Sequence, residues 1–165
     1  MKKIVAMVLL PMLLCGCGKQ EVFETVSDEG EIPASAEAYR IVLSLPEEAS
    51  QPIMDSGSEQ IYMCENFTIT VQQMEGGDMR ETLSQITGGA AEESSVIQTS
   101  RNGIPCYRLA WASVGEDGLQ SCRSVIMDDG NYHHAVTVMA DYTVAGDLDA
   151  QWQHILDSVI LVRTA

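Results

Sequence analysis

Three dipeptides that favour tight turns divide the second half of the chain into segments of similar length. Asn102-Gly103, Asp117-Gly118 and Asp129-Gly130 each separate two stretches rich in nonpolar residues. Asn, Asp and Gly tolerate the positive φ angles of two-residue hairpin turns, so these dipeptides are strong hairpin signals. They predict four consecutive antiparallel strands, over residues 96–101, 104–112, 119–128 and 132–142. A meander sheet is therefore the feature that the sequence constrains most.

The third turn also allows a prediction of strand register. A two-residue loop would set Ile126 opposite His133 and bring polar side chains onto a nonpolar face. A three-residue loop instead sets Ile126 opposite Tyr132 and Cys122 opposite Val136, so that both nonpolar faces align. We therefore predict a three-residue loop, with a glycine bulge.

Further strands and two helices are predicted on either side of the meander. Period-two alternation or short nonpolar runs predict strands over 39–45, 61–64 and 67–72, the last two joined as a hairpin at Glu65-Asn66. Asp78, as an N-cap with Glu81 three residues later, predicts a helix that runs to about Gly88. Asp147 is predicted to cap a second helix, whose nonpolar stripe consists of Leu148, Trp152, Ile155, Leu156 and Val159. Residues 160–162 fit either an edge strand or a continuation of this helix.

The N-terminus has the features of a secretory leader. Lys2-Lys3 precede a short nonpolar run that Pro11 interrupts, and the run is too short to cross a bilayer, which takes about 20 residues. Leu14-Cys15-Gly16-Cys17 resembles a lipobox, so the chain resembles a bacterial lipoprotein in which Cys17 is the first mature residue and is diacylated. Cleavage without lipid attachment is the alternative. The implied location is the extracytoplasmic face of the cell membrane, held by the lipid anchor.

Charge and composition limit the classes of partner. Removing residues 1–16 takes away Lys2 and Lys3 and leaves seven basic and 24 acidic residues, a net charge of −17. Such a charge repels nucleic acid, so nucleic-acid binding is not expected. Residues 17–38 carry the lipidated cysteine and then acidic residues among Gly, Ser, Ala and Pro, which indicates a flexible tether. Residues 39–165 are predicted to form a single α+β domain.

Three cysteines remain in this domain, Cys64, Cys106 and Cys122. Outside the cytoplasm they could form one disulfide with one thiol left over, or all three could be buried free thiols. No Cys-x-x-Cys motif is present, so the spacing does not favour zinc. Cys106 lies among nonpolar neighbours, which raise the pKa of a thiol and argue against a nucleophile.

The remaining candidate site residues have stronger structural than catalytic interpretations. His133-His134 suggests a metal or acid–base pair, but neighbouring strand residues point to opposite faces, and we expect His134 to pack beside Val136 and bond a residue such as Ser124. The Asp128 to Asn131 segment lacks the full calcium-loop pattern and reads as a turn. No hydrolase elbow, phosphate loop or cofactor motif is present.

Aromatic and methionine side chains are interpreted as core. Trp111, Tyr107 and Tyr132 could line a ligand cleft, but a chain with nine aromatic residues needs them for packing. The nine methionines likewise read as filler of gaps in the core rather than as metal ligands, because no Met-x-x-Met cluster occurs.

The predicted order of elements resembles a known fold family. A strand, a hairpin, a helix, a four-strand meander and a closing helix over residues 39–162 are similar to the PsbP-like fold, with Tyr132 to Val138 preceding a Trp-bearing terminal helix that ends in Asp157-Ser158-Val159-Ile160. Members include extrinsic photosystem II subunits, a small eukaryotic Ran-binding protein and many bacterial lipoproteins. The resemblance implies an α+β domain, an antiparallel meander sheet covered by two helices, with a noncatalytic adaptor or accessory role.

The sequence therefore predicts a membrane-tethered lipoprotein that is not an enzyme and binds an unidentified protein partner. Two rival functions remain open. One is a small hydrolase or thiol enzyme with a site built from His134, Cys122 or Ser124. The other is a lipoprotein that sequesters a small ligand in an aromatic cleft around Trp111.

Overall fold

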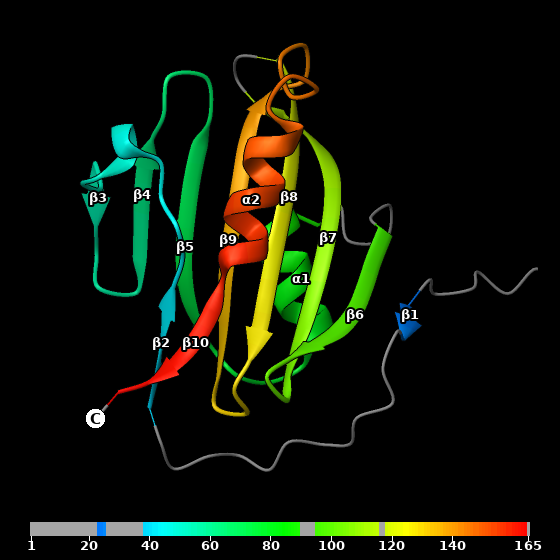
Figure 1. Ribbon diagram of the computed structural model, residues 1–165. Coiled ribbons are helices and arrows are strands. Elements are labelled where there is room, and N and C mark those ends of the chain that lie inside the picture. Colours follow the sequence, from blue (N-terminus) through cyan, green and yellow to red (C-terminus); the bar gives the residue numbers. More distant parts are fainter. Residues whose placement is uncertain (1–22, 26–37, 90–94, 116–117, 165) are drawn as a thin grey trace, which may run out of the picture.

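The computed structural model describes residues 23–25, 38–89, 95–115 and 118–164. Figure 1 shows one large sheet with a helix on each side and a smaller two-stranded ribbon. The strands are β1 (Phe23–Thr25), β2 (Tyr39–Val42), β3 (Met54–Asp55), β4 (Glu59–Met63), β5 (Thr68–Glu75), β6 (Ser95–Arg101), β7 (Ile104–Gly115), β8 (Gly118–Asp128), β9 (Tyr132–Asp141) and β10 (Ile160–Arg163). The helices are η1 (Glu47–Ala49), α1 (Met79–Thr87) and α2 (Asp149–Ser158).

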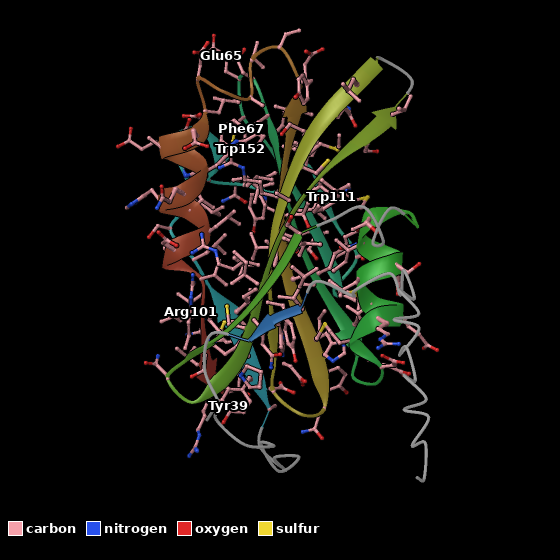
Figure 2. All side chains as sticks on the ribbon, turned by 90° about the vertical axis from the view of Figure 1, so that its right-hand side faces the viewer. Tyr39, Glu65, Phe67, Arg101, Trp111 and Trp152 are labelled. Carbon is pink, nitrogen blue, oxygen red and sulfur yellow. The ribbon has the colours of Figure 1, made fainter. Side chains whose placement is uncertain are left out.

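The large sheet has the strand order β1-β6-β7-β8-β9-β5-β4-β3. Its seven strands from β6 to β3 are antiparallel, and β1 pairs with β6 in parallel. Helices α2 and α1 lie on opposite faces of this sheet (Figure 2). The predicted α+β class, an antiparallel meander with two helices, is therefore confirmed. The short strand β1 falls within the stretch that the sequence indicates as a tether; residues 17–22 and 26–37 of that stretch lie outside the described residues.

The predicted meander is present as β6 to β9. At its first turn, Asn102 and Gly103 have φ angles of 54° and 77°, and Arg101 pairs with Ile104 across them. This is the two-residue hairpin that the dipeptide predicts, because both central residues need positive φ. At the second turn Gly115 pairs with Gly118, and the two residues between them are outside the described part of the chain.

The predicted register of the third turn is wrong. Ile126 lies opposite Ala135, and Cys122 lies opposite Met139 rather than Val136. The chain reverses at Gly130 and Asn131, and the N–H of Asp129 donates to the carbonyl of Tyr132 at 3.1 Å. The two-residue reversal brings polar residues onto the α1 face, where hydrogen bonds satisfy them.

Two of these polar residues bond each other. The hydroxyl of Thr137 donates to Ser124 Oγ at 3.1 Å, and Ser124 Oγ donates to the carbonyl of Val136 at 3.0 Å. Buried polar groups with hydrogen-bond partners carry little net penalty. A prediction that only separates nonpolar from polar residues could not foresee this pairing.

Helix α1 forms where the sequence predicts it. The carboxylate of Asp78 accepts a hydrogen bond from the backbone N–H of Arg80 at 2.9 Å, and Gly88 ends the helix in the left-handed conformation. Both are standard solutions for the unpaired backbone groups at helix ends. The buried side chain of Leu83 points from α1 to the sheet.

Helix α2 begins later than predicted. Its N-cap position is Leu148, without a side-chain cap, so the assignment of Asp147 as the cap is wrong. The N–H of Asp147 instead donates to the carbonyl of Val144 at 3.0 Å, in a turn that precedes the helix. The predicted nonpolar stripe is confirmed at Trp152, Ile155, Leu156 and Val159, which are all buried.

The chain ends in a strand, which decides between the two alternatives left open for residues 160–162. Strand β10 pairs antiparallel with β2, with Ile160 opposite Val42 and Arg163 opposite Tyr39. Strand β2 ends at Val42, three residues before the predicted end at Leu45. The pairing joins the two ends of the domain.

Two nonpolar clusters form the core, one on each face of the sheet. The larger lies under α2, where Trp152 meets Phe67 edge to face at a ring distance of 6.1 Å (Figure 2). The smaller lies under α1 and contains Leu83, Leu109 and Ile126. Because successive side chains of a strand point to opposite faces, its core residues pack alternately in the cluster under α2 and in the cluster under α1.

Candidate functional site

The β8–β9 turn holds a buried histidine–carboxylate pair. His134 Nε2 lies 2.8 Å from Asp129 Oδ2, and both residues are 2% exposed. The other carboxylate oxygen of Asp129 accepts hydrogen bonds from the backbone N–H groups of Asn131 and Tyr132, at 2.8 Å and 2.7 Å. Since a carboxylate only accepts, His134 donates from Nε2. The pair fixes the turn and leaves little access to solvent.

The neighbouring imidazole points the opposite way. His133 Nδ1 lies 2.6 Å from the hydroxyl oxygen of Thr82 on α1, and His133 Nε2 lies 3.7 Å from the Asp128 carboxylate. Because the carboxylate faces Nε2, we place the ring proton there and assign Thr82 as the donor to Nδ1. Proximity of the His133 ring, followed by the N–H of Gly130, lowers the pKa of Asp128 from its usual value. The hydrogen bond between Thr82 and His133 connects α1 to the sheet.

The structure confirms the opposite orientation of the two histidines but corrects the predicted partner of His134. That partner is Asp129, because Ser124 lies on the other face of the sheet. The proposed assembly of His134 with Cys122 or Ser124 is likewise not formed, since both latter residues share the α1 face. Among the described residues, no group of three or more His, Cys, Asp or Glu side chains is placed to hold a metal ion.

The carboxylates of Asp128 and Asp129 stabilise the turn by accepting backbone hydrogen bonds, as predicted. Asp128 accepts the N–H of Gly130 at 2.8 Å, and Asp129 accepts the two N–H groups that follow. Each carboxylate thus bonds its own backbone two residues ahead, which is the common role of Asp in turns. Both carboxylates are already engaged with the protein.

The three cysteines of the domain are buried free thiols. Burial raises the pKa of Cys64 and of Cys122 to about 11, and also raises the pKa of Cys106. A thiolate is the reactive form of cysteine, so a raised pKa suppresses reactivity near neutral pH. The structure therefore favours the second alternative, three buried thiols without a disulfide.

One part of the sheet surface has exposed nonpolar side chains. A row of cross-strand neighbours on the α1 face runs from β7 to β4 through Trp111, Cys122, Met139, Thr68 and Met63. From Cys122 to β4 exposure increases along this row: Cys122 is buried, Met139 and Thr68 are half-buried, and Met63 is 51% exposed. In Figure 1, α1 lies behind β7 and β8, and no described helix lies behind β3, β4 and β5.

A second row extends this surface toward the sheet edge. It contains Thr137, Thr70, Ile61 and Met54, and Met54 is 41% exposed. We call the surface formed by Met54, Ile61, Met63, Thr68, Thr70, Thr137 and Met139 the open face; Trp111 lies at its border.

The interpretation of the methionines as core filler is wrong for Met54 and Met63. Alternation alone could have signalled Met63, because Tyr62 and Cys64 on either side of it face the core.

The candidate aromatic cleft is not assembled. Tyr107 and Trp111 pack against the cluster under α1, as the core interpretation predicts. Tyr132 lies on the other face, where its ring meets His134 at a centroid distance of 6.4 Å, and it is 40% exposed, so the core interpretation is wrong for Tyr132. No helix in the described part of the chain is long and nonpolar enough to cross a membrane. Cys17, the predicted site of lipid attachment, lies outside the described residues.

Comparisons with known proteins relate this arrangement to solved structures. No protein family model and no curated protein matches the sequence. LpqN, a Mycobacterium tuberculosis protein involved in cell envelope biogenesis, superimposes with a TM-score of 0.52 at 12% identity, over 78% of this chain and 86% of LpqN. The two chains share a fold. At this identity the likeness concerns the fold alone.

Two further structures have lower scores. Cyanobacterial PsbP from Synechocystis sp. PCC 6803 aligns at 7% identity with a TM-score of 0.48, over 75% of this chain and 82% of its own. A protein of unknown function from Pseudomonas aeruginosa aligns at 8% identity with a TM-score of 0.43, over 72% and 79%. At these scores, neither match supports a conclusion about the present chain.

Proposed function

We propose that this chain is an extracytoplasmic lipoprotein, anchored to the cell membrane through Cys17, whose α+β domain is a noncatalytic binding or accessory module. The observation that carries the binding role is the open face, where Met54 and Met63 are 41% and 51% exposed beside the part of the α1 face that packs under the helix. Contiguous nonpolar surface that stays exposed on a folded domain marks a site of interaction.

The state of the titratable groups supports the same role. His134 and Asp129 are committed to each other and to the turn, and the cysteine thiols have raised pKa values. A catalytic group must reach the substrate and exchange its proton near the working pH. The hydroxyl of Ser124 is also bonded within the sheet.

The anchor is tested by replacing the proposed acylated residue. Cys17→Ser removes the thiol on which a diacylglyceryl group is attached, and two acyl chains are needed for stable anchoring. We expect the variant to move from the membrane to the soluble fraction. Full retention of Cys17→Ser in membranes would contradict the anchor.

The binding role is tested separately by crosslinking in cells. The anchored chain and Cys17→Ser are each crosslinked, purified and analysed by mass spectrometry. A reproducible protein partner that depends on the anchor would support an accessory module. Recovery of no partner above background with either form would contradict the binding role.

A further inference from the structure

We infer that the open face docks a partner protein which presents a nonpolar surface bordered by lysine or arginine side chains. This inference rests on the proposed binding function and names the surface and the chemistry of its partner. The first argument is the placement of nonpolar atoms. Met54 and Met63, at 41% and 51% exposed, lie on adjacent strands, and Ile61 lies between them in sequence on the same face.

The open face also continues into packed structure. Trp111 packs against the cluster under α1, and Met139 lies two strands away in the same row. A nonpolar surface that joins a rigid sheet offers preformed side chains, which reduces the ordering cost of binding. Methionine adapts its shape to a partner, and is frequent at binding surfaces for this reason.

The distribution of charge determines the partner's chemistry. All three arginines of strands β3 to β9 project to the opposite face, toward α2. There Arg101 and Arg108 contact Asp157, and Arg123 contacts Asp149. These strands carry no lysine. The sheet therefore contributes no arginine or lysine to the α1 face, and α1 itself carries Arg80 next to Glu81.

Carboxylates remain at the border of the open face. Glu59 lies at one side, where it accepts a hydrogen bond from Gln72, and exposed Asp141 lies one row beyond Met139. Without residues 1–16 the chain has a net charge of −17, and the carboxylates of Glu59 and Asp141 give this border a negative local charge. Complementary interfaces place positive side chains against such a border.

The same charges argue against other occupants. A second copy of this chain would bring carboxylates against carboxylates, which costs association energy. An anionic membrane surface would be repelled in the same way. A protein with a basic border around nonpolar residues meets neither obstacle.

Site-specific photocrosslinking tests the inference in the anchored, full chain. Met63 is replaced with p-benzoylphenylalanine, and isolated membranes that carry the protein are irradiated at 50 mM and 500 mM salt. The matched control position is Val114, which is 83% exposed and lies on the opposite face near the β7–β8 turn. We expect a protein crosslink at Met63 whose yield falls at least tenfold at high salt, because screening weakens contacts between opposite charges.

A second variant addresses the nonpolar contact. Met54→Glu is expected to reduce the Met63 crosslink at least tenfold, and Val114→Glu is expected to leave it unchanged. Both residues are exposed, and near-ultraviolet circular dichroism verifies that each variant keeps its fold. The crosslinked peptide of the partner should contain Lys or Arg beside nonpolar residues.

Each contrary result has a distinct meaning. Crosslinks only between copies of this chain, only to lipid, or independent of salt would overturn the inference. A partner captured at Val114 and not at Met63 would also overturn it, while the proposed binding function would stand. Capture of a protein at neither position would overturn the inference and the proposed function together.

Discussion

The imidazole of His134 donates a hydrogen bond to the carboxylate of Asp129 at 2.8 Å, and both residues are almost completely buried. The same carboxylate accepts two backbone N–H groups of the turn that connects β8 to β9. The Asp129 carboxylate therefore ties the buried imidazole of His134 to the backbone of the turn between β8 and β9.

Replacement of Asp129 should strongly destabilise the fold. Asp129→Ala leaves the buried Nε2–H of His134 and two backbone N–H groups without their acceptor, and a buried donor left unsatisfied costs about 1–3 kcal/mol. Urea unfolding measures the loss in the free energy of unfolding. Asp128→Ala is the matched control, because Asp128 is more exposed and accepts one backbone N–H; equal losses for both variants would contradict this account.

The stability should depend on pH through Asp128. Its pKa is lowered from 3.8, mainly by the His133 ring. A carboxyl with a lower pKa in the folded state stabilises the fold above its unfolded pKa, and this contribution is lost as the pH falls through the folded pKa. The difference in free energy of unfolding between wild type and Asp128→Asn should therefore decrease as the pH falls below about pH 4. A difference that persists unchanged to pH 2 would rule this out.

Arg101 should stabilise the end of α2. Its guanidinium donates to the carbonyls of Leu156 and Val159, both at 2.9 Å, which satisfies acceptors that the helix leaves unpaired. Arg101→Ala should lower the free energy of unfolding by about 2 kcal/mol. The control Arg108→Ala removes a more exposed contact to Asp157 and should cost less than about 1 kcal/mol. Denaturant titration compares the two, and a larger loss for Arg108→Ala would be the contrary result.

Two adjacent glycines should respond differently to alanine. A Cβ atom at Gly76 would lie 2.6 Å from the carbonyl oxygen of Asn131, whereas a Cβ at Gly77 would meet nothing within 4 Å. The contact at Gly76 is with backbone, which cannot move aside without shifting the β8–β9 turn. Gly76→Ala should cost about 1–3 kcal/mol, and Gly77→Ala should be nearly neutral. Thermal unfolding of both variants is the measurement; similar midpoints would argue against the close approach.

The cysteines should be unreactive in the folded protein. At pH 8 a thiol with a pKa of about 11, as for Cys64 and Cys122, is almost entirely protonated. Cys64, Cys106 and Cys122 should react with a chromogenic disulfide reagent only after denaturation, and then as three thiols. One thiol after denaturation without reductant would show a disulfide and contradict the structure.

Local sequence determined most of the secondary structure of this protein. Asp78 and Gly88 define α1, and Asn102-Gly103 defines the first hairpin, because capping and positive φ depend on a few neighbouring residues. The acidic net charge likewise follows from sequence alone. The opposite orientation of His133 and His134 followed from strand alternation.

Only the tertiary structure decided the features that depend on distant residues. The β8–β9 register follows from hydrogen bonds of Ser124 with Thr137 and of Thr82 with His133, and the partner of His134 follows from that turn. The pairing of β2 with β10 joins segments more than a hundred residues apart. The exposure of Met63 depends on where α1 ends over the sheet. Hydrophobic pattern specifies which side of a strand is nonpolar, whereas the packing of helices decides which part of that side is covered.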